Sequence, residues 1–274
     1  MPEGPEVKIT TDWLSKTLTG TKIIDNSNFP EINGTYIHKV YCKGKQIFFI
    51  LIKPNLAREL VYLNARLGMT GRWSLHAEVP HIRYWMKVQK VDVNFLNDSF
   101  ETTISEVTII NTDSRNFGDV ELFDESLYQK KLNKIGPDLL SDSIDPKMWM
   151  QKLRNPRIKG KFIADYLLEQ SYFSGIGNYL KSDILYISKI KPDRTLVSLT
   201  DQEIITLLEV SLKLIRESYD AGGLTIKDFW SPEGVRGGYK RKVYNRETDD
   251  LGNKIIKECF NSEKVTYWVA EVQK

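Results

Sequence analysis

The amino-acid sequence predicts an α+β protein with an antiparallel β-rich first half and a helical second half. Short runs of β-branched and aromatic residues, separated by turn residues, occupy positions 22 to 122. Helical periodicity dominates from residue 146 onward. A Ser- and Asp-rich stretch at 141 to 145 separates the two patterns, so we expect a domain boundary near residue 140.

Composition and charge exclude several classes of protein. The 274 residues are 41% hydrophobic and 27% charged, which is typical of a globular chain with a substantial core. Cys42, Cys259 and three histidines make no four-ligand zinc set. The longest apolar run, residues 47 to 52, is too short to cross a bilayer, and no signal peptide is visible, so we expect an intracellular, soluble protein. The net charge of +3 is small, so any affinity for nucleic acid depends on how the 39 Lys and Arg residues are arranged.

The N-terminus carries the first reactive pattern, Met1-Pro2-Glu3-Gly4-Pro5-Glu6. If Met1 is removed, Pro2 presents a free secondary amine next to the carboxylate of Glu3. An α-amino group titrates near pH ~7.7–8.0, so an unprotonated nucleophile is present at neutral pH. The alternative is a frayed terminus whose prolines open a helix. Apolar residues at helical spacing from 7 to 18, followed by Gly20, predict a short helix here.

The β-rich half is expected to form an antiparallel sandwich or barrel. Its clearest strand candidates are residues 46–52, 59–64, 85–95 and 101–110. Three turns carry more chemistry than a strand connection requires. Lys45 precedes an apolar strand, Met69 lies between two glycines, and Arg115 and Phe117 stand two apart on one turn. Each has a structural alternative, but Met69 could act as a wedge, and a cation with an aromatic could enter a base stack.

The second half is predicted to be helical. A charged helix and loop at 124–137 leads into it, and helical periods follow at 146–154, 159–170, 178–188 and after Thr200. The last of these opens with the capping box Thr200-Asp201-Gln202-Glu203 and stops at Gly222-Gly223.

A glycine-containing turn, Ser174-Gly175-Ile176-Gly177-Asn178-Tyr179, lies between two of these helices. Its glycines permit close backbone approach, and Asn178 begins a helix whose exposed N–H groups favour an anion such as phosphate. A tight helix–helix turn would also require glycine. A run of charges usually forms a solvated face, but two basic clusters that flank this turn favour contact with a nucleic-acid backbone. They comprise Arg154, Arg157, Lys159 and Lys161, and Arg236, Lys240, Arg241, Lys242 and Arg246.

Five motifs in order, MPEGPE, KGKQ, LGMTG, DSRNFG and SGIGNYLKSDILY, resemble the formamidopyrimidine-DNA glycosylase and endonuclease VIII family of base-excision repair enzymes. The resemblance covers essentially the whole chain. It implies a β-sandwich catalytic domain at 1–123, a linker at 124–144, a helix-two-turn-helix DNA-binding domain at 145–234 and a hairpin finger at 235–274.

The resemblance also implies the catalytic residues. Pro2 would attack C1′ of the damaged nucleotide and form a Schiff base, and Glu3 would serve as the acid and base. Glu6 would orient the terminus, and Lys45 would contact a phosphate close to the lesion. The implied activity is that of a bifunctional glycosylase and lyase, with base excision followed by β- and δ-elimination. No cofactor or metal is expected.

DNA contacts are implied in the same way. Asn178 matches the phosphate-binding asparagine of the turn, and Met69, Arg115 and Phe117 match the residues that fill the space left by the everted base. The finger arginine of the family falls at Lys264, which keeps the charge but loses the planar fork. Ala164 stands where a basic residue is common, so Lys159 or Lys161 would substitute for it.

The finger departs from the zinc-bearing members. Its cysteine positions are taken by Thr248, Leu251, Val269 and Val272, as in zincless endonuclease VIII-like enzymes. This feature and NYLKSDILY favour oxidised pyrimidines, hydantoins and ring-opened purines as substrates. Residues 221–229 instead resemble the formamidopyrimidine branch, which leaves an enzyme directed at 8-oxoguanine as an alternative.

Two further alternatives are a catalytically inactive binder of damaged DNA with the same fold and an RNA- or ribosome-associated helix-two-turn-helix protein. Pro2 and Glu3 would have no use in the second. The expected partner is damaged DNA, as a duplex and also as a single strand, and the expected state is a monomer. The setting would be wherever DNA is present, nucleus or cytoplasm, including a viral or nucleocytoplasmic one.

Overall fold

The computed structural model describes the chain from residue 1 to 274 except residues 56, 58, 76–79, 97–98 and 225–228. For residues 91–96 and 99–103 it describes the backbone only. The described chain divides into two compact units. A sheet unit holds residues 1–2, 6–133 and 226–236, and a helical unit holds residues 3–5, 134–225 and 237–274. In the described residues no helix is long and apolar enough to cross a membrane.

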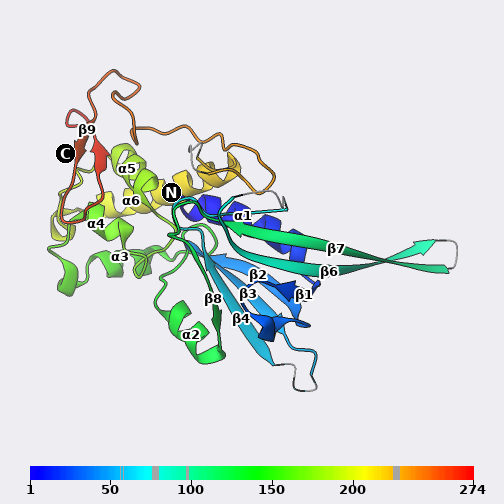
Figure 1. Cartoon of the computed structure of the whole chain (residues 1–274). Helices are drawn as coiled ribbons and strands as arrows, with labels where there is room; N and C mark the ends of the chain where they lie inside the picture. The colour runs from blue at the N-terminus through cyan, green and yellow to red at the C-terminus, as the bar shows by residue number, and fades with distance from the viewer. Residues whose placement is uncertain (56, 58, 76–79, 97–98, 225–228) are drawn as a thin grey trace. The chain divides into compact units, whose positions relative to one another are not determined.

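One antiparallel sheet of eight strands forms most of the sheet unit (Figure 1). Its spatial order is β5-β7-β6-β1-β2-β3-β4-β8. The strands are β1 (Lys22–Asn26), β2 (Tyr36–Lys43), β3 (Gln46–Ile52), β4 (Leu60–Arg66), β5 (Arg72–Ser74), β6 (Ile82–Leu96), β7 (Ser99–Thr112) and β8 (Asp119–Phe123). Register shifts in β1 between Ile23 and Asp25 and in β2 between Ile37 and Lys39 interrupt the ladder, and such bulges increase strand twist.

The sheet closes over its own core, as a sandwich does. The rings of Phe49 in β3 and Trp73 in β5 lie 5.6 Å apart, although four strands separate β3 from β5 in the sheet order. Both side chains are fully buried, together with Val7, Leu14 and Leu18 of helix α1 (Gly4–Leu18). The apolar spacing of this helix therefore buries one face against the sheet. Helix η1 (Pro30–Ile32) and helix α2 (Glu125–Asn133) complete the unit.

The helical unit contains the remaining elements. They are α3 (Pro146–Leu153), η2 (Pro156–Ile158), α4 (Ile163–Leu168), α5 (Asn178–Ile187), η3 (Leu196–Ser198), α6 (Asp201–Asp220), β9 (Ile256–Glu258) and β10 (Thr266–Trp268). Trp149 of α3 donates its indole N–H to the carbonyl of Ile204 in α6 at 3.0 Å, which joins those two helices. The predicted capping box of α6 is present, with Thr200 and Glu203 bonded reciprocally.

One helix prediction was wrong in part. The sequence predicted a helix over residues 159–170, but α4 spans only Ile163–Leu168 and a separate 3-10 turn occupies Pro156–Ile158. Phe162 is extended instead of helical and forms an isolated bridge with Thr195. Tertiary pairing therefore overrides helical propensity at this position.

Candidate active site

The carboxylate of Glu3 lies at the N-terminus of helix α5, inside the helical unit. Its Oε2 accepts from the backbone N–H of Gly177 at 2.7 Å and of Leu180 at 3.3 Å, and its Oε1 accepts from the N–H of Tyr179 at 2.8 Å. The side chain is only 2% exposed. Three backbone donors and the positive end of the helix dipole stabilise a negative charge there. The turn predicted to bind an anion therefore binds a carboxylate of the chain itself.

Glycine is required on both sides of this contact. The N–H of Gly4 donates to the carbonyl of Gly175 at 2.8 Å, and a Cβ on Gly4 would lie 2.9 Å from the Gly175 Cα. A Cβ on Gly177 would lie 2.3 Å from the Glu3 carboxyl carbon. Gly175 also has φ of +106°, which glycine adopts readily. The glycines of MPEGPE and SGIGN therefore allow these two segments to pack backbone against backbone.

The other predicted catalytic residues, Pro2, Glu6 and Lys45, belong to the sheet unit. Pro2 is buried and directly precedes Glu3. Glu6 is fully buried in the first turn of α1, where its backbone carbonyl accepts the Thr10 hydroxyl at 2.9 Å. Lys45 is half-buried in the turn between β2 and β3, after Gly44 at φ of +58°.

The β9–β10 hairpin docks along α5 through three polar contacts. Asn178 donates from Nδ2 to the carbonyl of Val265 at 2.8 Å, and the buried amine of Lys181 donates to the Thr266 hydroxyl at 2.7 Å. Farther along the helix, the N–H of Tyr267 donates to the Ser182 hydroxyl at 3.3 Å. The exposed Lys264 immediately precedes Val265, so Asn178 and Lys264 belong to the same end of the helical unit.

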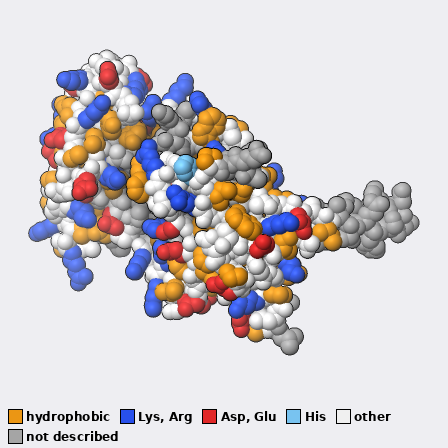
Figure 2. All heavy atoms as spheres, viewed as in Figure 1, with side chains coloured by type: hydrophobic (Ala, Val, Ile, Leu, Met, Phe, Trp, Pro, Cys, Tyr) orange, Lys and Arg blue, Asp and Glu red, His pale blue; other side chains and the backbone are white. Residues whose placement is uncertain are grey.

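One arginine in each of the two basic clusters is bonded to other groups of the protein. Arg154 bonds Asp201 and the carbonyls of Leu196 and Leu199, so it joins structural elements. Arg246 likewise bonds two backbone carbonyls and Asp250. On the face shown in Figure 2, Lys and Arg side chains are interspersed with Asp and Glu.

Lys159 is exposed, and Lys161 is half-buried with its amine 5.4 Å from the centre of the Tyr172 ring. Ala164, at the position where a basic residue is common in the family, is 1% exposed in α4. A basic side chain at this position would have to leave the core.

The predicted void-filling residues come together in the sheet unit. The guanidinium Nη1 of Arg115 lies 3.9 Å from the Met69 sulfur, and Phe117 on the same turn is 62% exposed.

The buried carboxylates that sequence reasoning missed include Asp113 and Asp183. Asp183 in α5 accepts from the Tyr239 hydroxyl and from the N–H groups of Lys242, Val243 and Tyr244. Burial raises its pKa, and these donors partly offset that rise. Its partners lie about sixty positions away in the sequence, so local pattern carries no signal for them. Asp113 is the first residue of the DSRNFG motif, whose resemblance implies roles for Arg115 and Phe117 only.

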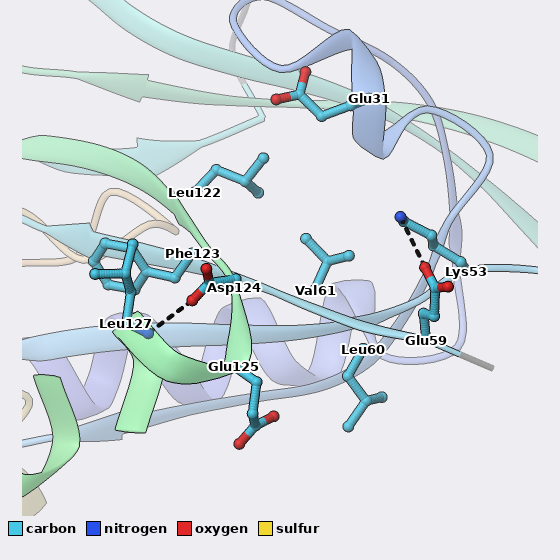
Figure 3. Close-up of a pocket in the computed structure, with 10 residues that line it drawn as sticks. All are labelled: Glu31, Lys53, Glu59, Leu60, Val61, Leu122, Phe123, Asp124, Glu125 and Leu127. Atoms are coloured by element: carbon cyan, nitrogen blue, oxygen red, sulfur yellow. Dashed lines mark hydrogen bonds and ion pairs between the residues drawn. The ribbon is translucent and has the colours of Figure 1, made fainter. Parts of the chain in front are cut away.

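The sheet unit also contains a pocket with largely apolar walls (Figure 3). Its apolar walls include Leu60, Leu122 and Leu127. Its acidic groups are engaged locally, since Asp124 accepts from the Leu127 N–H and Glu59 pairs with Lys53. None of the predicted site residues lines it, so we assign it no role in substrate binding.

The finger residues do not fit a zinc ion. At the positions that hold cysteine in zinc-bearing members, Val269 and Val272 pack with Val243 and Ile255, while Leu251 is 78% exposed. Among the described residues no group of three His, Cys, Asp or Glu could hold a metal ion. Apolar packing and hydrogen bonds stabilise the finger instead.

An antiparallel sheet unit and a helical unit whose glycine turn holds a buried carboxylate at the start of α5 define the fold and the site. Comparison with known proteins is more specific. A family model for the formamidopyrimidine-DNA glycosylase N-terminal domain matches residues 1–120, and one for the formamidopyrimidine-DNA glycosylase helix-two-turn-helix domain matches residues 135–229. The chain belongs to the formamidopyrimidine-DNA glycosylase and endonuclease VIII family, whose members are DNA glycosylases of base excision repair.

Individual relatives cover nearly all of the chain. A formamidopyrimidine-DNA glycosylase from Rickettsia africae is 30% identical over 264 residues, which is 90% of this chain and 89% of the relative. Endonuclease 8 from Pectobacterium carotovorum is 24% identical over 286 residues and covers 100% of both chains. The fold matches that of Lactococcus lactis Fpg in complex with abasic-site DNA, with a TM-score of 0.80, 24% identity and 99% coverage of each chain. The predicted α+β fold and family are confirmed.

Proposed function

We propose that the protein is a bifunctional DNA glycosylase and abasic-site lyase that acts on oxidised bases through a Schiff base on Pro2. The observation that supports this most is the binding of the Glu3 carboxylate at the N-terminus of α5. Glu3 fills the space next to Gly177, so a residue with a side chain could not replace that glycine. This contact holds in place the residue next to Pro2. It explains why Glu3 and Gly4 stand at the terminus, whereas a disordered terminus would not require either residue.

The proposed chemistry needs a free terminal amine. With Met1 removed, the lone pair of the Pro2 nitrogen attacks C1′ and the C1′–base bond breaks, so the base leaves with the bonding electrons and takes a proton from solvent. The ionised Glu3 carboxylate accepts the proton of the Pro2 nitrogen and passes it to the sugar ring oxygen as the C1′–O4′ bond breaks, which leaves an iminium. The resulting iminium draws electrons from the sugar, so the proton on C2′ becomes acidic. Its removal expels the 3′ phosphate, and a second elimination expels the 5′ phosphate. With Met1 retained, Pro2 is an amide and this sequence cannot begin.

Phosphate contacts are assigned to Asn178, Lys264, Lys45, and Lys159 or Lys161. The Asn178 amide donates to the carbonyl of Val265 and also bonds the Tyr244 hydroxyl, so in this proposal it exchanges one of these partners for a phosphate oxygen. We assign damaged duplex DNA as the substrate, with Met69, Arg115 and Phe117 filling the gap left by the everted nucleotide, and single strands as a further substrate form. The protein would act as a monomer.

For the lesion, we favour oxidised pyrimidines, hydantoins and ring-opened purines because the finger lacks the zinc-binding cysteines. The relatives named above include both a formamidopyrimidine-DNA glycosylase and an endonuclease 8, so an enzyme directed at 8-oxoguanine is the alternative. The residues Thr225 to Asp228, within the segment that favours that alternative, lie outside the described residues. Both relatives are bacterial, which gives no support to a nuclear or viral setting.

Borohydride trapping on DNA with an abasic site tests the proposal. The processed protein should form a covalent adduct, and a form with Met1 retained or the terminus extended should bind the same DNA without forming one. Binding without trapping by the processed protein would indicate an inactive damaged-DNA binder. Comparable cleavage of 8-oxoguanine and dihydrouracil duplexes would overturn the lesion preference.

A further inference from the structure

The buried carboxylate of Asp113 joins two loops of the sheet unit. Its Oδ1 accepts from the Thr70 hydroxyl and from the N–H of Arg115 at 3.1 Å. Its Oδ2 accepts from the N–H of Phe117 at 2.8 Å and of Gly118 at 2.7 Å. Residues 67–71 and 113–118, the paired loops, are therefore bonded through one side chain that is only 1% exposed.

The backbones of the paired loops also meet directly. A Cβ on Gly68 would lie 2.4 Å from the Gly118 nitrogen, and a Cβ on Gly118 would lie 2.5 Å from the carbonyl oxygen of Arg66. Asn116 has φ of +56°, a conformation that asparagine tolerates better than most residues. The Thr70 hydroxyl also accepts from the Arg115 N–H at 3.2 Å.

The fixed backbone contrasts with the side chains that it carries. Arg115 and Phe117 are exposed, while the main-chain N–H group of each is bonded to Asp113. A loop that is already ordered loses less conformational entropy when it enters a base stack than a loop that must become ordered on binding. The arrangement is that of a preorganised wedge.

We propose that Asp113, together with Thr70, is a positioning residue for base eversion, holding Met69, Arg115 and Phe117 as one unit that enters the duplex. This inference rests on the proposed function. Asp113 touches none of the reacting atoms in that function, and it acts through the loops that it joins.

The charge state of Asp113 suits this role. Burial alone would raise the pKa of the carboxyl, but the Thr70 hydroxyl and the N–H groups of Gly118, Arg115 and Phe117 outweigh it, so the pKa is lowered. The group therefore stays ionised at neutral pH, and all four donors keep an acceptor.

Two substitutions test the proposal. Asp113→Asn replaces one acceptor oxygen with a donor that faces N–H groups, and Thr70→Val removes the hydroxyl that reaches across the loops, whereas Thr70→Ser keeps it. Asp119→Asn is the matched control, because Asp119 follows the same turn but pairs with Arg66. If Asp113→Asn fails to fold, the Thr70 pair still tests the proposal.

Two measurements separate positioning from chemistry. The first is the fluorescence of 2-aminopurine placed beside a non-cleavable abasic analogue in a duplex, which reports unstacking on binding. The second is single-turnover excision of dihydrouracil from a duplex. Loss of a hydrogen bond to a charged group predicts a fall of about ten- to a hundredfold in excision for Asp113→Asn and Thr70→Val. The fluorescence rise should fall in parallel, and Thr70→Ser and Asp119→Asn should match wild type.

Each remaining outcome has a definite meaning. Wild-type excision and fluorescence in Asp113→Asn and Thr70→Val would overturn the positioning role. A loss in Thr70→Val that Thr70→Ser does not restore, or an equal loss in Asp119→Asn, would overturn it as well. If the wild type unstacks the duplex but does not cleave, the proposed function fails and the positioning role is still judged by fluorescence. If the wild type does neither, both fail.

Discussion

At the scale of single residues, Gly177 is decisive for the proposed catalytic carboxylate. Its N–H binds Glu3, and its missing side chain leaves the space that the Glu3 carboxyl group occupies. Glu3 and Gly177 are far apart in the sequence, so neither motif alone predicts their contact. Both motifs were identified from the sequence, and only the structure shows that one binds the other.

Gly177→Ala should abolish most base excision while DNA binding persists. The added Cβ displaces the Glu3 carboxylate, and acid–base catalysis is typically worth about a hundredfold or more. Single-turnover excision and a binding titration measure the two effects. Gly160→Ala is the control, because a Cβ there meets nothing within 4 Å. Full excision by Gly177→Ala would show that the Glu3 position does not matter.

Lys181 gives a pH-dependent prediction at the same scale. Burial lowers the pKa of its amine to about 8, although the charges of Glu3 and Asp165 partly oppose that shift. Because the folded-state pKa lies below the unfolded value, the unfolded chain binds more protons between the two values. Stability contributed by Lys181 therefore rises with pH from about 8 to about 10.4, by an amount on the order of 3 kcal/mol.

Urea denaturation of wild type and Lys181→Met at several pH values measures this contribution. The unfolding free energy of the wild type minus that of Lys181→Met should increase as pH rises from about 7.5 to 10. Tyrosines with raised pKa values titrate in both proteins and cancel in the difference. A difference independent of pH would contradict the buried, uncharged state of Lys181 above pH 8.

At the scale of elements, two buried polar side chains stabilise the turns of the finger. Asp249 is buried and accepts from the N–H groups of Leu251 and Asn253, the amide of Asn253 and the hydroxyl of Tyr186. At the other end, Gln273 bonds the N–H of Val269 and the carbonyl of Ile190. Asp249 thus joins its turn to Tyr186 of α5, and Gln273 joins its turn to Ile190, just after that helix.

Asp249→Ala should loosen the finger by about 2 to 3 kcal/mol, because it leaves buried donors without an acceptor. Amide hydrogen exchange in residues 245–256 reports the local opening. Asp250→Ala is the matched control, since that neighbour makes only an exposed pair with Arg246, worth about 1 kcal/mol or less. Equal protection in the two variants would remove Asp249 from this role.

Metal removal should have no effect on the same element. We expect an excess of EDTA to leave the melting temperature and the exchange rates of finger amides unchanged, because Val269 and Val272 pack where zinc ligands would stand. A fall in melting temperature that zinc restores would contradict this expectation.

The elements differ in how well the sequence predicted them. Residues 46–52 coincide with β3, and the capping box of α6 was identified correctly, because periodicity and caps are local signals. The helix predicted at 159–170 failed where Phe162 pairs with Thr195. The bonds of Asp113 to Thr70 and of Asp183 to Tyr239 could not be predicted, because they join distant segments through one side chain.

At the scale of the whole molecule, the charge distribution limits how DNA can be bound. The net charge is +3, and acidic and basic side chains are interspersed on the face shown in Figure 2. Arg154 and Arg246 are bonded within the protein. With so small a net charge, affinity depends on where cations are placed, and we propose Lys45, Lys264 and one or both of Lys159 and Lys161 for this role.

These cations predict a shallow salt dependence. Three or four phosphate contacts give a slope of log K against log salt concentration of about −3 to −4. Lys264→Ala should weaken binding to all DNA sequences alike and reduce the magnitude of the slope by about 1. Lys213→Ala is the control, since Lys213 is an exposed residue of α6 paired with Glu217. Fluorescence anisotropy between low and physiological salt measures both. A slope unchanged by Lys264→Ala would mean that the finger lysine does not replace the arginine of the family.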